Sequence, residues 1–327
     1  MKALVLFSGG LDSSLALRLV KEQGLEVEAI NFVTVFCQNH RSGTRSCTPT
    51  QELGVKLKIV NVVSEEYWEI VKHPKYGYGK NLNPCIDCRI FMFRKAKKFM
   101  QEIGADFIVT GEVLGQRPMS QRRKTMQLIE NESELSGLVL RPLSAKLLKP
   151  TIPEREGWVD RQKLLNFSGR FRKPQMKLAK EMQINNYTCP AGGCLLTDHA
   201  FAKRMQDLLE HGEFEINDVL LLKLGRHFRF NERTKLVIGR DKRENKQIEQ
   251  LAKKDDVLFV PQNYPGPTAL LQGKDAGKFS ELTASIVASF SDVSPGKKLI
   301  LHGKENGEEK IWTTLPLKKE EIKQYII

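Results

Sequence analysis

Hydrophobic residues in the first third of the chain occur in short runs, which glycine and polar residues separate. Residues 3–7 (Ala-Leu-Val-Leu-Phe) are typical of a buried strand, and residues 15–21 of a helix. Residues 27–33 and 55–63 predict two more strands, with a short helix at 50–53 between them. The alternation of strands and helices predicts an α/β fold with a doubly wound parallel sheet.

Residues 8–14, Ser-Gly-Gly-Leu-Asp-Ser-Ser, connect the first strand to the first helix, with Asp12 or Ser13 predicted near the helix N-cap. Two glycines allow a turn with positive φ and let a ligand approach the backbone. The N–H groups of such a turn and of the helix N-terminus attract an anion, above all a phosphate. We therefore predict a phosphate site, with Asp12 as a metal ligand or as a residue that orders the turn, formed by Ser8, Gly9, Gly10, Asp12, Ser13 and Ser14.

This segment resembles the PP-loop, SGGxDS, of the ATP-pyrophosphatase superfamily, whose members cleave ATP between its α and β phosphates and adenylate a substrate. The resemblance implies ATP and Mg²⁺ as cofactors and a sheet like that of the adenine nucleotide alpha hydrolases. Ligands of such sheets bind at the carboxyl ends of the strands. Phe32, which lines the adenine pocket in the superfamily, and Thr110-Gly111 after a predicted fourth strand therefore join the expected nucleotide site. The alternative for residues 8–14 is a turn that binds no ligand, and the alternative for Phe32 is a side chain of the hydrophobic core.

A second stretch brings the resemblance closer. Asn83-Pro84-x-x-x-Cys88, a basic amphipathic helix and then Gly-Ala-Asp-Phe-Ile-Val-Thr-Gly at 104–111 look like the tRNA 2-thiouridylase branch of the superfamily. The match covers roughly the first 110 residues. Many thiouridylases carry Asp-x-x-Cys where this chain has Cys85-x-x-Cys88, and the iron–sulfur-dependent tRNA thiolases carry Cys-x-x-Cys there.

Four cysteines form two pairs, Cys85 with Cys88 and Cys189 with Cys194, and the second pair flanks a Pro-Ala-Gly-Gly turn. Four thiolates are typical of structural zinc or of an iron–sulfur cluster. Related thiolation enzymes hold a [4Fe–4S] cluster by Cys-x-x-Cys and one distant cysteine, which implies Cys85, Cys88 and either Cys189 or Cys194 as ligands. Persulfide exchange between Cys88 and a downstream cysteine needs no metal. Cluster, persulfide and zinc all remain open at this point.

A third group, Cys37, His40 and Cys47, matches no common zinc spacing. We predict that this polar stretch is a loop on the substrate side of the site.

The formal net charge of +13 indicates a polyanionic partner, most simply nucleic acid. Between residues 141 and 180, eleven Lys or Arg stand against three acidic residues, and Trp158, Phe167 and Phe171 are interleaved. We interpret this segment as RNA-facing, the alternative being a solvated surface. Residues 73–83 mix lysines with tyrosines, and such loops can hold phosphates and stack on bases, the alternative being an ordinary exposed loop.

We place a domain boundary near residue 200, so that residues 1–200 form the PP-loop domain and residues 201–327 a smaller α+β domain. Strands are expected at 218–224 and several later positions. The Gly225-Arg226 and Pro265-Gly266-Pro267 turns are similar to those of the RNA-binding domain NFACT-R. This resemblance implies that the following residues hold RNA phosphates: Arg226, His227, Arg229, Arg240, Lys242 and Arg243. The alternative is a dimerisation or structural role for the domain.

Together these features predict an ATP-dependent tRNA sulfurtransferase that adenylates a base carbonyl oxygen and replaces it with sulfur, releasing AMP and pyrophosphate. Asp12, Cys88, Cys189 and Cys194 are the expected catalytic residues. The expected partners are tRNA or another structured RNA and a sulfur donor, namely sulfide, a cysteine desulfurase or a sulfur carrier. Two alternatives are a PP-loop ligase or amidotransferase for a small molecule, with structural zinc, and a non-catalytic RNA-binding protein.

No apolar run is long enough to span a membrane, and the N-terminus shows no signal peptide. We therefore expect a cytoplasmic protein with no membrane partner and with reduced cysteines.

Overall fold

The computed structural model describes residues 1–37, 48–185, 187, 193–212, 214–305 and 308–327. The chain forms two compact units, an N-terminal unit (Met1–Thr197) and a C-terminal unit (Asp198–Ile327). Within the described ranges, no helix is both long and apolar enough to cross a membrane.

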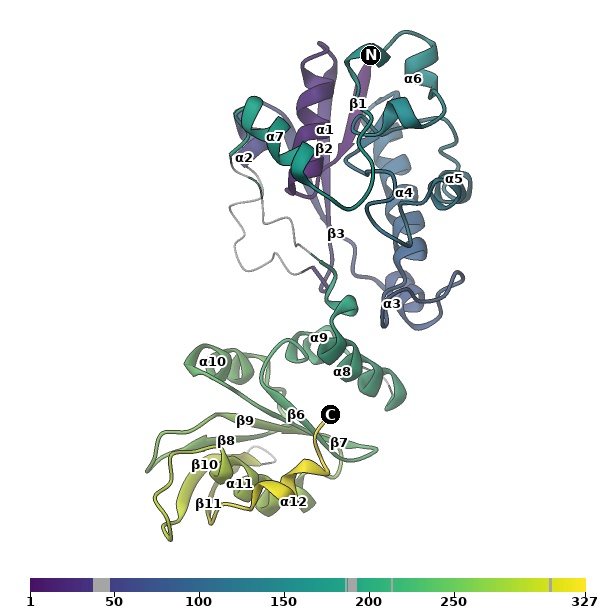
Figure 1. Ribbon diagram of the computed structural model, residues 1–327. Helices are drawn as coiled ribbons and strands as arrows, with labels where there is room; N and C mark the ends of the chain where they lie inside the picture. The colour runs from purple at the N-terminus through teal and green to yellow at the C-terminus, as the bar shows by residue number, and fades with distance from the viewer. Residues whose placement is uncertain (38–47, 186, 188–192, 213, 306–307) are drawn as a thin grey trace. The chain divides into compact units, whose positions relative to one another are not determined.

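The N-terminal unit is built on a parallel sheet with the strand order β3-β2-β1-β4-β5 (Figure 1). This arrangement confirms the predicted α/β fold class. The order runs outward from β1 through β2 to β3 and then resumes on the other side of β1 with β4, so the switch point lies between β1 and β4. The strands are β1 (Lys2–Leu6), β2 (Glu26–Val33), β3 (Lys56–Asn61), β4 (Phe107–Thr110) and β5 (Val139–Leu140).

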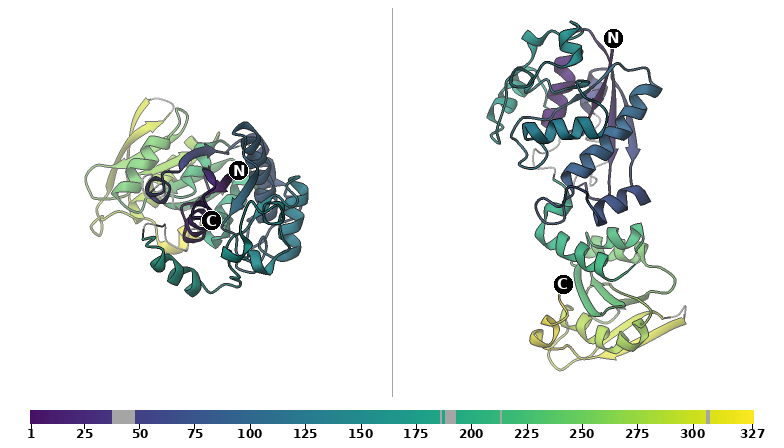
Figure 2. Two further views of the ribbon diagram at one scale, coloured as in Figure 1. Left: turned by 90° about the horizontal axis from the view of Figure 1, so that it is seen from above. Right: turned by 90° about the vertical axis from the view of Figure 1, so that its right-hand side faces the viewer.

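Helices cover both faces of this sheet (Figures 1 and 2). Successive residues of a strand point to opposite faces. Ala3 and Val5 accordingly share a core cluster with residues of α1 (Leu11–Lys21), whereas Leu4 packs with residues of α4 (Cys85–Glu102) and α5 (Arg123–Glu132). The smaller elements are α2 (Thr48–Glu52), α3 (Glu65–Lys72), α6 (Ile152–Arg155), α7 (Lys173–Glu181) and the 3₁₀ turns Ala145–Leu147, Arg161–Lys163 and Leu195–Thr197.

Two helix starts differ from the predictions. Helix α1 begins at Leu11 with Gly10 as its N-cap, so Asp12 lies inside the first turn and does not cap it. Helix α4 begins at Cys85, directly after Pro84, rather than beyond Arg89. Cys85 and Cys88 therefore lie three residues apart in the first turn of a helix, on one face of it.

The C-terminal unit is built on an antiparallel sheet with the order β11-β10-β8-β9-β7-β6. Its strands are β6 (Arg226–Asn231), β7 (Thr234–Ile238), β8 (Val257–Pro261), β9 (Ala269–Gln272), β10 (Leu299–Glu305) and β11 (Glu308–Thr314). Its helices are α8 (His199–Glu210), α9 (Ile216–Leu221), α10 (Lys242–Leu251), α11 (Ser280–Ser289), α12 (Lys319–Lys323) and the 3₁₀ turn Ala276–Phe279. The α+β class of this domain is as expected.

Residues 218–224, predicted as a strand, form most of helix α9 and its end. A short apolar run looks alike in a buried strand and in a buried helix. Here the backbone N–H of Glu215 donates to the carboxylate of Asp218 at 2.8 Å, and this reciprocal cap starts a helix.

The core of the C-terminal unit lies mainly between the sheet and α11. Trp312 is fully buried there, with its ring 4.4 Å from that of Phe259 between centroids. The sheet's other side packs on α9 and α10 through residues such as Ile248.

The packing of α4 on the sheet can be tested by substituting a buried residue of this helix. Phe93 is fully buried between α4 and the strands, and the guanidinium of Arg89 lies 5.1 Å from its ring centroid. We expect Phe93→Ala to lower the free energy of unfolding by about 3–5 kcal/mol because it leaves a cavity. The exposed Lys98→Ala on the same helix should change it by less than about 0.5 kcal/mol. Urea denaturation followed by circular dichroism measures both, and equal effects would contradict this packing.

Candidate nucleotide and thiol site

The turn after β1 is compact and held by its own hydroxyl groups. Gly9 has φ +73°, which favours glycine. Ser13 and Ser14 are buried, and their Oγ atoms donate to the carbonyl of Gly10 at 2.9 and 3.1 Å. The exposed Ser8 lies with its Oγ 3.2 Å from that of Ser13. Ser13 and Ser14 therefore shape the turn, and Ser8 is the hydroxyl that faces solvent.

Gly111, directly after β4, packs on the backbone of the first turn of α1. A Cβ at Gly111 would lie 2.5 Å from the carbonyl carbon of Asp12 and 2.6 Å from the nitrogen of Ser13. Thr110 before it is buried. The structure thus brings Thr110-Gly111 against residues 8–14 at the switch point of the sheet. Phe32, at the end of β2, is half-buried in the core cluster on the α4 face.

Asp12 is a half-buried carboxylate with one satisfied oxygen. The side-chain amide of Gln116 donates to its Oδ2 at 2.9 Å, while its Oδ1 has no hydrogen-bond partner among the described residues. Burial raises the pKa of Asp12, against the opposing effects of Gln116, Arg172 and Arg117. Buried polar atoms are normally paired, and a carboxylate oxygen is a ligand that Mg²⁺ accepts. Gln116 belongs to no motif in the sequence, although its place just after β4 puts it at the same sheet edge.

Residues 168–172 lie along the segment that follows β4. The N–H of Gly169 donates to the carbonyl of Leu114 at 2.8 Å, and the charge of Arg172 acts on Asp12. Next to Arg172, the side chain of Phe171 is 83% exposed. Exposed aromatic rings of this kind can stack on nucleic-acid bases.

Other parts of the basic segment 141–180 do not face solvent as predicted. Trp158 packs in the core, 6.3 Å from the ring of Phe107, and Phe167 joins a neighbouring core cluster. Arg141 is buried in ion pairs, and Arg161 binds Glu154 and the carbonyls of residues 145 and 148. In this part of the segment, the charged and aromatic side chains therefore make internal contacts that stabilise the fold.

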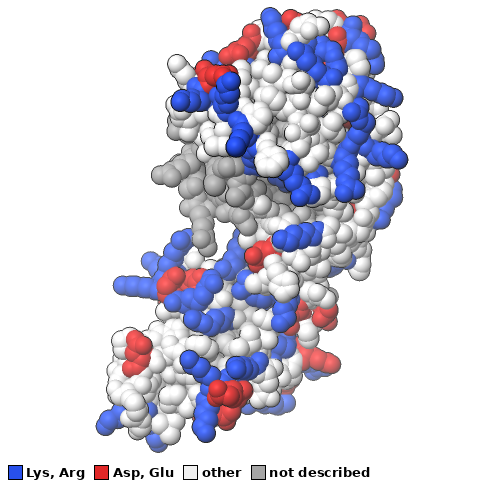
Figure 3. All heavy atoms as spheres, viewed as in Figure 1, with Lys and Arg blue, Asp and Glu red and all other residues white. Residues whose placement is uncertain are grey.

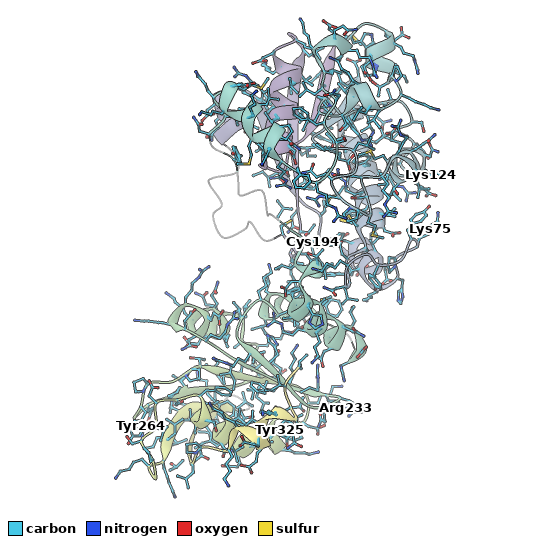
Figure 4. All side chains as sticks on the ribbon, viewed as in Figure 1. Lys75, Lys124, Cys194, Arg233, Tyr264 and Tyr325 are labelled. Carbon is cyan, nitrogen blue, oxygen red and sulfur yellow. The ribbon has the colours of Figure 1, made fainter. Side chains whose placement is uncertain are left out.

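The four described cysteines gather from separate segments of the N-terminal unit. Cys37 follows β2 and forms an antiparallel bridge with Cys194, where the N–H of Leu195 donates to the carbonyl of Phe36 at 2.9 Å. Cys85 and Cys88 come from the start of α4. Figure 4 labels Cys194. Cys189 lies outside the described residues, so its predicted role stays a prediction.

The charges of these thiols act on one another's pKa, which indicates that the thiols lie in the same region of the unit. Burial, followed by the charge of Cys85, raises the pKa of Cys88 to about 12. Burial, followed by the charge of Cys88, likewise raises the pKa of Cys194 to about 12, and Cys37 contributes to both shifts. The hydroxyl of Tyr67 lies 3.9 Å from the sulfur of Cys88.

We call Cys37, Cys85, Cys88 and Cys194 the thiol site. Sulfur ligands in partly aromatic surroundings fit a soft metal centre or a sulfur carried on cysteine. Among the residues with a described position, no three His, Cys, Asp or Glu side chains are already placed to hold a metal ion. Cys37 was missed as a member of the site because its sequence spacing matches no ligand pattern. Its position four residues after Val33, at the end of β2, was the available signal.

A buried ion network joins the thiol site to the nucleotide turn. Glu112, directly after Gly111, accepts from Arg89 at 2.6 and 3.0 Å and from Arg141 at 3.0 Å. Burial alone would raise the pKa of Glu112, but the two guanidinium charges outweigh it and hold the pKa below its ordinary value. Arg89 is the neighbour of Cys88 in α4, so one carboxylate ties the start of α4 to the end of β4.

In the C-terminal unit, four of the six predicted phosphate contacts make internal contacts, and Arg226 is one of them, with its guanidinium 4.9 Å from the centroid of the Phe290 ring. His227 is buried with its Nε2 2.7 Å from the carbonyl of Leu224, and burial holds its pKa well below the ordinary range. Arg229 pairs with Asp207, and Arg240 with Glu244. Arg226, Arg240, Lys242 and Arg243 are exposed, and of these Arg240 is held by its ion pair with Glu244. Figure 3 shows further Lys and Arg side chains over wide parts of the visible face of each unit.

Comparison with known families agrees with both units. Residues 1–150 match the family model described as thiamine biosynthesis protein (ThiI), and residues 225–326 match the NFACT protein RNA binding domain. Residues 1–150 thus resemble PP-loop proteins of the tRNA thiolation superfamily, and residues 225–326 resemble an NFACT-type RNA-binding domain. Both resemblances drawn from residues 8–14, 83–111 and 225–267 are thereby confirmed.

Curated relatives align with part of this PP-loop protein. A tRNA-specific 2-thiouridylase MnmA of Marinobacter nauticus is 32% identical over 145 residues, covering 39% of this chain and 36% of the relative. Another, of Pseudomonas fluorescens, is 25% identical over 69% of this chain and 60% of the relative. The chain thus spans less than two thirds of either protein. A crystal structure of a 4-thiouridine synthetase–RNA complex with bound ATP is 21% identical over 68% of this chain and 52% of that chain, with a TM-score of 0.40.

The bridge between Cys37 and Cys194 predicts a disulfide on oxidation. The two residues form a non-hydrogen-bonded antiparallel pair, whose Cα atoms typically lie about 4.5 Å apart, within the range that a disulfide spans. We expect diamide to oxidise both thiols and link them, as seen by peptide mapping without reduction. Cys37→Ser should abolish this linked peptide and Cys85→Ser should retain it. A free Cys194, or its linkage to another cysteine in the wild-type protein, would contradict the bridge.

The network around Glu112 predicts a pH-dependent loss of stability. Glu112→Gln leaves two guanidinium groups without their buried carboxylate, and we expect a loss of about 3–5 kcal/mol at pH 7. Because the folded-state pKa of Glu112 lies below 4.5, its contribution is present above pH 4.5 and is lost as the pH falls through the folded value. The stability gap between wild type and variant should therefore narrow below pH 4.5.

Urea denaturation at several pH values measures this gap. Glu102→Gln is the matched control, because its exposed carboxylate pairs only loosely with Lys58 at 3.7 Å and should contribute less than about 1 kcal/mol. A gap for Glu112→Gln that stays constant from pH 7 to pH 3 would show that its charge is not what stabilises the network.

Proposed function

We propose that this protein is an ATP-dependent tRNA sulfurtransferase, which adenylates a uridine or cytidine carbonyl oxygen and replaces it with sulfur. The observation that carries the proposal is that the nucleotide turn and the thiol site belong to one sheet edge and are tied together through Gly111, Glu112 and Arg89. The family models and the names of the curated relatives support the same reaction class.

In the proposed first step, ATP binds with its phosphates at residues 8–14 and with the unpaired Oδ1 of Asp12 directed at Mg²⁺. The helix N-terminus and the turn stabilise negative charge on the phosphates. The carbonyl oxygen of the base attacks the α-phosphorus, a P–O bond forms, and pyrophosphate leaves. This makes the oxygen part of a good leaving group.

In the second step, a sulfur held at the thiol site attacks the activated carbon of the base, and AMP leaves with the former carbonyl oxygen. Cys85 and Cys88, with Cys194 or Cys189, are the residues we assign to holding the sulfur or a [4Fe–4S] cluster. Such a cluster, when bound, would present sulfide at an iron that no cysteine occupies. With sulfide as donor, this replacement changes no oxidation state.

RNA binding in this proposal depends on exposed cations in both units. Arg226, Lys242 and Arg243 lie on the surface of the NFACT-type domain, and Arg170 flanks the exposed Phe171 in the PP-loop unit. Cations hold phosphates without regard to sequence, and an exposed ring stacks on an unpaired base. A structured RNA, with tRNA as the first candidate, fits these surfaces.

Asp12→Asn tests the nucleotide half of the proposal. We expect roughly 100-fold slower formation of AMP and thionucleoside with ATP, sulfide and bulk tRNA, because Asp12 would no longer place a charged oxygen at the metal. Asp255→Asn, at an exposed turn of the C-terminal unit, is the control and should retain wild-type rates. AMP is measured by chromatography and thionucleosides by mass spectrometry of digested tRNA.

Wild-type protein that yields neither AMP nor a thionucleoside would overturn the proposal. Metal analysis after anaerobic purification distinguishes the state of the thiol site. Iron with labile sulfide supports a cluster, whereas zinc alone, together with AMP formation only on small molecules, would favour a ligase.

A further inference from the structure

The PP-loop unit has a pocket of about 420 Å³ between the loop that precedes α4 and the loop that follows β4. Its size falls within the range of pockets that hold small organic groups. The walls are mostly apolar or aromatic and the remaining side chains are basic or neutral. The lining residues are Tyr78, Gly79, Lys80, Ile86, Pro118, Met119, Arg122 and Thr125.

Contacts across the pocket hold its walls together. The hydroxyl of Tyr78 lies 2.7 Å from the carbonyl of Val71 and 2.9 Å from that of Lys72, which fixes the ring against the end of α3. The sulfur of Met119 packs so closely on Gly79 that a side chain at residue 79 would displace it. The two loops therefore form one built wall rather than two separate surfaces.

Residues that line the pocket are close in sequence to both halves of the proposed active site. On one side, Ile86 stands between Cys85 and Cys88 in the first turn of α4. On the other side, Met119 is three residues from Gln116, which binds Asp12. Three residues of chain span at most about 11 Å. A ligand in this pocket would thus contact residues that are close in sequence to the thiols and to Gln116, which binds Asp12.

The rim carries cations that are available to a ligand. Lys80 and Arg122 are exposed, and neither makes an ion pair with any acidic side chain that the structure describes. Arg122 begins a run of three cations that ends at Lys124, and Figure 4 shows Lys124 and Lys75 on the same side of this unit. Lys75 already pairs with Glu132.

We propose that this pocket receives the base of an unpaired pyrimidine nucleotide that is extruded from the RNA. The ring of Tyr78 and the side chains of Ile86 and Met119 contact the faces of the base, while Lys80 and Arg122 hold the flanking phosphates. Enzymes that act on a base take it out of the helix and place it between apolar or aromatic side chains. This inference rests on the proposed function and names the site of its RNA substrate.

Met119→Glu places a carboxylate in the pocket and Met119→Leu keeps it apolar. We expect Met119→Glu to lower the apparent second-order rate constant of tRNA-dependent AMP formation at least roughly tenfold, with the Kd for ATP and the melting temperature unchanged. Met119→Leu should retain the rate within about threefold. Ile59→Glu is the matched control, because Ile59 is an exposed apolar side chain of β3 outside both this pocket and the basic segment 141–180.

Crosslinking tests the placement without turnover. Transcribed tRNA that contains 5-iodouridine is bound to the wild-type protein and irradiated, and the crosslinked peptides are mapped. We expect crosslinks to peptides that contain Tyr78 or Met119, and their loss in Met119→Glu.

The outcomes separate the two proposals. If the wild-type protein forms AMP with tRNA and Met119→Glu does so equally well, the pocket is not the base site while the proposed function stands. Crosslinks confined to peptides other than those of the pocket would also overturn the inference. If the wild-type protein forms no AMP, the proposed function fails, and the crosslink map still decides whether the pocket binds an RNA base.

Discussion

A buried carboxylate, Glu112, lies between the guanidinium groups of Arg89 and Arg141 directly after the strand that ends beside the nucleotide turn. A buried charge is tolerable only when it is paired and hydrogen-bonded, so this geometry is strongly constrained. Arg89 belongs to the first turn of α4, which also carries Cys85 and Cys88. The position of the thiols relative to the end of β4 therefore depends on one carboxylate, which directly follows Gly111 in the chain.

Gly111 connects the end of β4 to the nucleotide turn, residues 8–14. Its Cα packs on the backbone between Asp12 and Ser13, and any side chain would push the end of β4 away from α1. Asp12 is then held by Gln116, a few residues further along the same segment. The run from Thr110 to Gln116 thus positions both halves of the candidate site, because it leaves the sheet at the switch point between β1 and β4.

The sequence was sufficient for those features that depend on neighbouring residues. The strand and helix order, the parallel sheet and the turn at residues 8–14 follow from short apolar runs and from a glycine turn between them. Features that depend on distant residues were not predictable. Cys37 lies beside Cys194 because a β-bridge forms between segments that are about 150 residues apart in the chain. Glu112 looks like an ordinary charged residue in the sequence, because its partners Arg89 and Arg141 are brought to it only by the fold.

The same limit explains the errors about surface charge. His227, Arg229 and Arg240 follow basic turns, yet the first is buried in the core and the others bind carboxylates within their own unit. A sequence does not distinguish a cation that has an acidic partner across the fold from one that faces solvent. Internal ion pairs leave the formal charge of +13 unchanged, because they join cations and carboxylates that are already counted. Exposed Lys and Arg side chains that have no acidic partner are the groups that attract a polyanion such as RNA.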